Sequence, residues 1–116
     1  MKLIFYILKN NKKLKLDNEQ ISLLGIKRKL REEYRELIKI TSKFEEDNEL
    51  DSLKDVAREA MDVIQVCILY MYKINKLAKE KGSNNLIEEI NKAHNNKLII
   101  ERRWVPETSI SVEIKK

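Results

Sequence analysis

The chain has 116 residues, a length that predicts one compact domain, residues 1–116, rather than two. Its 42% hydrophobic and 37% charged residues, with only two glycines and one proline, argue against disorder, collagen-like repeats and turn-rich β-barrels. The single cysteine, Cys67, cannot form an intramolecular disulfide, and no signal peptide or membrane-spanning run is recognisable. We therefore expect a cytoplasmic protein with no membrane partner, and the modest net charge of +5 does not make nucleic acid an expected partner.

The N-terminal part combines a predicted β-hairpin with a predicted helix. Residues 2–16, KLIFYILKNNKKLKL, place β-favouring residues on both sides of Asn10-Asn11, a pair suited to a tight turn. Asp17 and Gln20 then resemble a capping box, which predicts a first helix over about residues 18–44. Gly25 costs such a helix about 1 kcal/mol relative to alanine, so residues 18–24 are alternatively a separate turn.

A second helix is expected from residue 49 or 52 to residue 80, after an acidic loop. Residues 63–72 within it are apolar on almost every side, which is typical of a helix buried all round. Three helices of one chain could not easily cover this segment. The sequence therefore predicts a mainly all-α fold, an antiparallel helical bundle completed by oligomerisation.

The C-terminal part begins with a third predicted helix, which follows Gly82-Ser83-Asn84 and extends to about residue 102. Beyond Pro106, three apolar residues alternate with polar ones at the period of a strand: Ile110, Val112 and Ile114. Short β-strands are therefore expected at both termini, where they could pair into a small sheet. The helical core is expected over residues 17–104, with terminal extensions at 1–16 and 105–116.

Two pairs of carboxylates occur at helical spacing on the first two predicted helices. The first helix carries E-E-x-x-E, residues 32–36, and the second carries E-x-x-D, residues 59–62. A spacing of three residues places both carboxylates of a pair on one helix face, about 5–6 Å apart at Cβ. Glu33 flanks the apolar stripe of Leu30, Tyr34 and Leu37, and the second pair enters the apolar run. Each motif alone is most often a solvated face, but together they indicate a shared site.

Carboxylates that are desolvated together are costly, and their pKa values rise unless a cation is bound. An all-oxygen set of ligands suits Mg²⁺ or Mn²⁺, and the sequence contains neither a cysteine-histidine cluster for zinc nor a glycine-rich phosphate loop. On the third helix, Lys97 falls close to the apolar face, so it is either a snorkelling lysine or a cation directed at an anionic ligand.

At these residues the sequence resembles the MazG-like all-α NTP pyrophosphatases, whose hallmark is E-E-x-x-E followed by E-x-x-D. The surrounding segments KLREEYRELIKI, DVAREAMDVIQV and HNNKLIIERRW are also similar, and the resemblance spans about residues 22–104. It implies hydrolysis of nucleoside triphosphates to monophosphate and pyrophosphate with Mg²⁺, in a homodimer or homotetramer. Water would attack the α-phosphorus in line while pyrophosphate leaves.

The resemblance also implies a role for each matching residue. The metal ligands would be Glu33, Glu36, Glu59 and Asp62, and Glu32 would orient or deprotonate the attacking water. Lys97 and Arg102 would hold the phosphate chain, with Asn95 as a further substrate contact. Arg103 stands where many relatives carry glycine. The alternative functions are a non-catalytic nucleotide- or polyanion-binding module and an oligomerisation module of the same fold.

Overall fold

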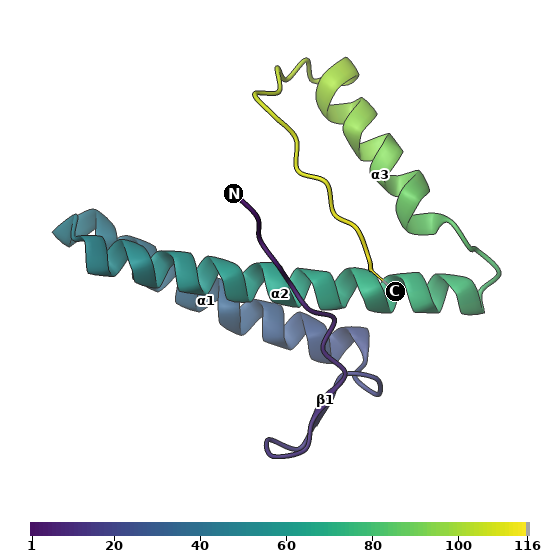
Figure 1. The fold of residues 1–116 in the computed structure, drawn as a ribbon, viewed down its shortest axis with the longest axis horizontal. Helices are drawn as coiled ribbons and strands as arrows, with labels where there is room; N and C mark the ends of the chain where they lie inside the picture. Colours follow the sequence, from purple (N-terminus) through teal and green to yellow (C-terminus); the bar gives the residue numbers. More distant parts are fainter. Residues whose placement is uncertain (116) are drawn as a thin grey trace.

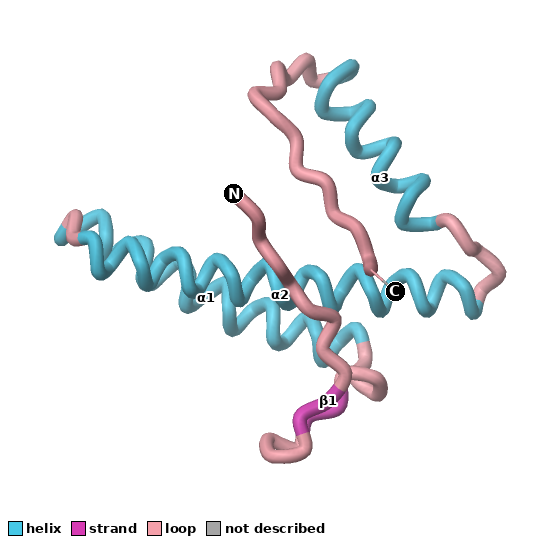
Figure 2. Tube along the Cα trace, in the orientation of Figure 1, coloured by secondary structure: helices cyan, strands magenta, loops and turns pink. Residues whose placement is uncertain are grey.

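Helices dominate the computed structural model, which describes residues 1–115 (Figure 1). The long helices α1 and α2 lie side by side, and the shorter α3 stands apart from them (Figure 2). The mainly all-α class with short strands near the N-terminus is confirmed. In chain order the elements are β1 (Asn10–Asn11), β2 (Leu16–Asp17), α1 (Leu23–Asp47), α2 (Leu50–Glu80), α3 (Leu86–Asn96) and the π-helical turn η1 (Lys97–Glu101).

The N-terminal hairpin forms, but its turn lies further along the chain than predicted. β1 and β2 pair in antiparallel register, with Asn10 opposite Asp17. The chain reverses over residues 12–15, where Lys15 adopts a left-handed φ of 56°. The amide of Leu14 donates to Oδ1 of Asn11 at 3.1 Å. Asparagine accepts such bonds at the start of a turn, so Asn11 precedes the turn instead of occupying its centre.

The start of α1 corrects the predicted helix boundary. Ser22 is the N-cap, and its Oγ accepts a hydrogen bond from the amide of Gly25 at 3.1 Å. Oδ1 of Asp17 instead accepts from the amide of Glu19 at 3.0 Å, which stabilises a local turn before the helix. Gly25 therefore lies in the first helical turn, where a Cβ would approach Cγ1 of Ile21 to 2.7 Å.

A short connection holds α1 and α2 antiparallel. Asn48 ends α1 in the left-handed conformation, and its amide donates to the carbonyl of Phe44 at 2.7 Å. Oδ2 of Asp47 accepts from Oγ of the buried Ser52 at 2.6 Å, and its Oδ1 accepts from the amide of Glu49. These two bonds hold the pKa of Asp47 below its usual range. The connection is thus hydrogen-bonded both to the end of α1 and to the start of α2.

The core of the chain is the seam between α1 and α2. The buried apolar residues of the described chain are Ile26 on α1 and Leu69 and Ala78 on α2. Tyr34, expected in the buried stripe, is instead 56% exposed. The row that turns towards α2 begins at Ile26, and Tyr34 lies to one side of that row.

α3 forms an arm that packs only on the end of α2. It contacts α2 beside the connecting loop, and it has no contact with α1 (Figure 1). The apolar face predicted for this helix is open, since Ile90 is 57% and Ile100 is 67% exposed. The last predicted turns are π-helical, from Lys97 to Glu101. A single chain therefore leaves the third helix without a core.

The two terminal segments do not pair with each other among residues 1–115, so the expected terminal sheet is wrong. The first residues run instead across α2, where Nε2 of Gln65 donates to the carbonyl of Tyr6. Nζ of Lys73 donates to the carbonyl of Glu19 at 3.2 Å. The strand expected near the C-terminus does not form within the described residues, since residues 105–115 contain no strand and are exposed. No helix in the described part of the chain is both long enough and apolar enough to cross a bilayer.

Candidate metal centre

Three of the four predicted metal ligands converge in the structure. Glu33 comes from the middle of α1, and Glu59 and Asp62 come from one turn of α2. One carboxylate oxygen from each lies within 4.8 Å of the others. The α1–α2 hairpin brings them together because antiparallel packing sets the centre of α1 beside the first half of α2. The spacing of three residues on α2 then directs both of its carboxylates to the same side.

One oxygen of this cluster has no hydrogen-bond partner. Oε2 of Glu59 is enclosed by protein atoms and receives no donor from the described residues, although the glutamate side chain as a whole is only half-buried. Buried polar atoms nearly always have a partner, and an enclosed carboxylate oxygen without one is costly. A bound cation is the partner that carboxylates in this arrangement accept best.

Two of these carboxylates, Glu33 and Glu59, have raised pKa values. Burial raises the pKa of Glu33, and the charges of Asp62 and Glu59 raise it further. Burial likewise raises the pKa of Glu59, with additional repulsion from Glu36 and Asp62. No basic side chain offsets either shift. The cluster is therefore a region of concentrated negative charge, and a divalent cation would relieve the repulsion.

The remaining predicted acidic residues lie at the edge of the cluster. Glu36 is close enough to raise the pKa values of both Glu33 and Glu59, but it is exposed and outside the group of three converging oxygens. Glu32 is exposed next to Glu33. The structure thus provides a core of three ligands, with Glu36 one turn along α1 as a fourth carboxylate beside them.

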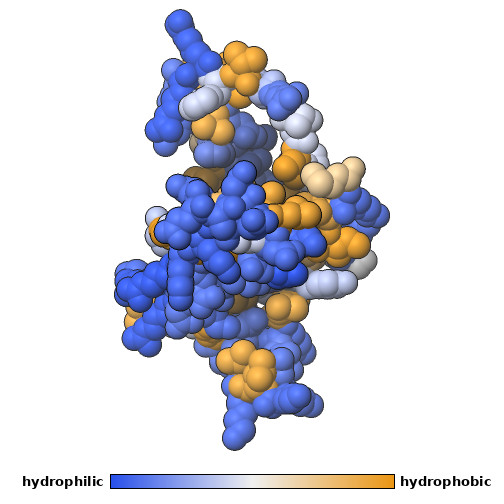
Figure 3. Space-filling model, turned by 90° about the vertical axis from the view of Figure 1, so that its left-hand side faces the viewer, coloured by the Kyte–Doolittle hydropathy of each residue, from blue (hydrophilic) through white to orange (hydrophobic). Residues whose placement is uncertain are grey.

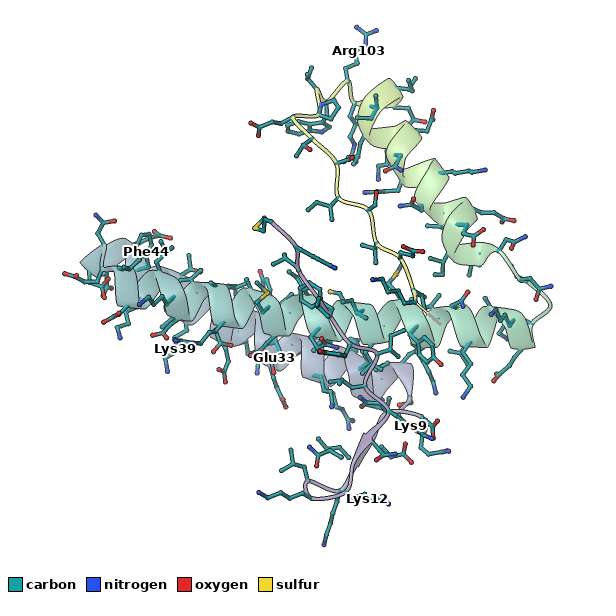
Figure 4. The ribbon with its side chains drawn as sticks, viewed as in Figure 1. Lys9, Lys12, Glu33, Lys39, Phe44 and Arg103 are labelled. Atoms are coloured by element: carbon teal, nitrogen blue, oxygen red, sulfur yellow. The ribbon has the colours of Figure 1, made fainter. Side chains whose placement is uncertain are left out.

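A shallow groove adjoins the carboxylates, and sequence reasoning missed it. It encloses about 470 Å³, and the carboxylates of Glu36 and Glu59 form part of its wall. The other lining residues all come from α1, and three of them are basic: Arg35, Lys39, Ile40 and Lys43. In Figure 4, Glu33 and Lys39 lie along the same edge of the helix pair. The sequence contained a signal for this groove, because Arg35, Lys39 and Lys43 are spaced four residues apart and therefore lie on one face of α1.

The predicted phosphate-binding residues lie elsewhere in the chain. Asn95 is near the end of α3, Lys97 is the first residue of η1, and Arg102 caps η1. All three side chains are exposed, and neither α3 nor η1 contacts α1. Figure 4 shows Arg103, which follows Arg102, at the far end of the arm from Glu33. One chain does not bring these residues to the carboxylates.

Comparisons with protein-family models, with curated proteins and with solved structures find no match for this chain. What the site can do chemically follows from its own residues. They supply three converging carboxylates, one unpartnered enclosed oxygen and an adjoining groove with basic walls.

Proposed function

We propose that the chain is a divalent-metal-dependent nucleoside triphosphate pyrophosphohydrolase, which converts a (deoxy)nucleoside triphosphate to the monophosphate and pyrophosphate. The observation that carries this proposal is the convergence of Glu33, Glu59 and Asp62, with Oε2 of Glu59 enclosed and unpartnered. The resemblance of the paired motifs to the MazG-like pyrophosphatases supports the choice of reaction. Mg²⁺ or Mn²⁺ would be held by these three carboxylates together with Glu36.

When bound, the cation supplies a Lewis acid that offsets charge on phosphate oxygens and activates water. Water forms a bond to the α-phosphorus, and the bond to the bridging oxygen of pyrophosphate breaks. Glu32 is exposed beside the ligands, and we assign to it the acceptance of the proton from the attacking water. No covalent bond to the protein is needed.

We also propose that the working unit is a homo-oligomer, a dimer or a tetramer. The open apolar faces of α2 and α3 support this, because exposed residues such as Ile64 and Ile90 would be covered by a second copy. Figure 3 shows apolar groups at several places on the surface, with a cluster at the right-hand side of the view. In such an assembly, Lys97 and Arg102 of one chain could serve the carboxylates of another.

The test is a panel assay with the full chain. Purified protein is incubated with canonical and modified nucleoside triphosphates, with and without Mg²⁺, and the products are identified. We expect monophosphate and pyrophosphate only when the metal is present, and a loss of about a hundredfold or more in the Glu59→Gln variant. Glu45→Gln, which changes an exposed carboxylate on α1 outside the cluster, serves as the matched control. Absence of pyrophosphate with every nucleotide would overturn the proposal.

A non-catalytic nucleotide- or polyanion-binding module is the second candidate function. It is favoured by the separation between the basic residues of η1 and the carboxylates within one chain. The double variant Glu59→Ala/Asp62→Ala discriminates between the two functions. An enzyme loses turnover in this variant, whereas a binder driven by charge binds the nucleotide as well or better once two negative charges are removed.

A further inference from the structure

The groove beside the metal centre is lined by three basic residues of α1 and by two carboxylates, one from α1 and one from α2. Arg35, Lys39 and Lys43 follow one another at a spacing of four along α1, so they form a row about 12 Å long on the helix surface. Glu36 and Glu59 line the same groove, and Glu59 is also one of the converging carboxylates. The groove and the metal centre therefore share a side chain and are continuous.

The three basic side chains form no ion pair within residues 1–115. The ion pairs that do occur there involve other cations, namely Lys9, Lys54 and Arg58. Arg35, Lys39 and Lys43 are all exposed, so their charged ends are available to a ligand in the groove. Lysine acts on phosphate as a point charge and arginine as a bidentate fork, so the row suits a chain of phosphates.

We infer that this groove is the phosphate-chain subsite of the metal centre, in which Arg35, Lys39 and Lys43 hold the part of the phosphate chain that extends away from the metal. The inference rests on the proposed function, because it assumes that a cation occupies the carboxylates. It assigns the phosphate contacts to α1 of the same chain. Lys97 and Arg102 are then not required for holding the phosphates.

Occupancy of the metal centre would control the charge of the groove. Without a metal, the two lining carboxylates would repel the negative charge of a phosphate chain in the groove. Coordination of a divalent cation neutralises the carboxylates, so the basic row then faces the ligand without competition. Binding of a phosphate chain is therefore metal-dependent, and it weakens as salt is added.

Isothermal titration calorimetry of the full chain tests this subsite with inorganic tripolyphosphate, in the presence and absence of Mg²⁺. The test variant is Lys39→Ala/Lys43→Ala. The matched control is Lys27→Ala/Lys79→Ala, which removes the same charge from two exposed helical lysines outside the groove. We expect the test variant to bind tripolyphosphate about tenfold more weakly and Mg²⁺ alone unchanged. The control should bind both as the wild type does.

A parallel titration with a nucleoside triphosphate separates the two sources of a phosphate chain. Loss of affinity for both ligands in the test variant supports a subsite that recognises the phosphate chain and not the nucleoside. If the test variant binds tripolyphosphate as tightly as the wild type, or if tripolyphosphate fails to bind, the subsite is wrong. A third variant, Lys97→Ala/Arg102→Ala, tests the arm. If only this variant binds tripolyphosphate more weakly, the arm holds the phosphates and the proposed subsite is likewise wrong. Failure of the proposed function is distinguishable, because the nucleotide panel then releases no pyrophosphate, whereas the titrations still report whether the groove binds a phosphate chain.

Discussion

At the scale of single residues, the site combines partial burial of carboxylates with repulsion between their charges. Glu33 and Glu59 are partly withdrawn from water, lie close to Asp62, and have raised pKa values for both reasons. Such a cluster destabilises the folded chain unless something compensates. Residues of this kind are retained where they perform a function, because a neutral side chain would pack there at lower cost.

The pH dependence of stability follows from the direction of these shifts. Because the folded chain raises the pKa values of Glu33 and Glu59, it binds their protons more tightly than the unfolded chain does. The stability of the metal-free protein therefore falls as the pH rises through the ordinary glutamate pKa to the raised folded values. We expect Glu59→Gln to melt at a higher temperature than the wild type at pH 7 without metal, and this advantage to shrink near pH 4.

Addition of Mg²⁺ at pH 7 should reverse the order of the two melting temperatures, so that the wild type melts above Glu59→Gln. The wild type gains stability by mass action because the cation binds only the folded cluster, while Glu59→Gln gains less. Melting curves at both pH values, with EDTA or with Mg²⁺, measure the four combinations. The exposed Glu45→Gln is the control and should follow the wild type throughout. A Glu59→Gln variant that gains as much as the wild type from Mg²⁺ would remove Glu59 from the metal centre.

At the scale of elements, the connection between α1 and α2 determines which carboxylates meet. Asn48 reverses the chain with a left-handed φ of 52°, and Asp47 and Ser52 bond across the junction. An antiparallel hairpin with this junction sets Glu33 opposite Glu59. A longer or differently capped connection would shift α2 along α1 and separate the ligands.

The conformation of Asn48 leads to a graded prediction. Asparagine and glycine tolerate the left-handed region, whereas a β-branched residue is strained there. We expect Asn48→Val to lower the free energy of unfolding by about 1–2 kcal/mol and Asn48→Gly to leave it nearly unchanged. Urea denaturation of the three proteins measures the difference. Equal losses in both variants would mean that the asparagine side chain, and not its backbone conformation, stabilises the junction.

At the scale of the whole molecule, the chain has too much surface for a compact monomer. Its accessible surface is 10420 Å², whereas a compact protein of 13.8 kDa exposes about 6,600 Å². Its radius of gyration is 16.9 Å, against about 13 Å for a compact chain of this length. The surplus greatly exceeds the area of about 800 Å² that each partner buries in a standard interface. Association of two or more copies would bury this surplus surface.

Size-exclusion chromatography with light scattering tests the association. We expect the wild type to form a dimer or tetramer at micromolar concentration. Ile64→Lys places a charge on the open face of α2 and should shift the population towards monomer by about tenfold or more in dissociation constant, since a charge buried at an interface is costly. Ile110→Lys makes the same change in the exposed C-terminal segment and is the control. A monomeric wild type would contradict the proposed assembly.

Local sequence signals predicted the helices well because the spacing of apolar residues along the chain largely determines where a helix forms. The helical period predicted the three helices, and residues 63–72 predicted a helix that one chain leaves partly uncovered, as the exposed Ile64 and Met71 show. Boundaries were less predictable because several side chains compete for the same amides. Asp17 and Ser22 are both suitable caps, and Ser22 caps α1 while Asp17 stabilises a turn.

The sequence by itself determined the helical class. It also determined the spacing that places Glu33 with Glu36 on one side of α1, and Glu59 with Asp62 on one side of α2, because these features depend on residues within one helix. Only the tertiary structure decided that the three carboxylates meet, that a basic groove continues from them, and that Lys97 lies on a separate arm. The physical reason is that the α1–α2 register and the direction of α3 depend on the junction at Asn48 and on packing between distant residues, which no periodicity along the chain encodes.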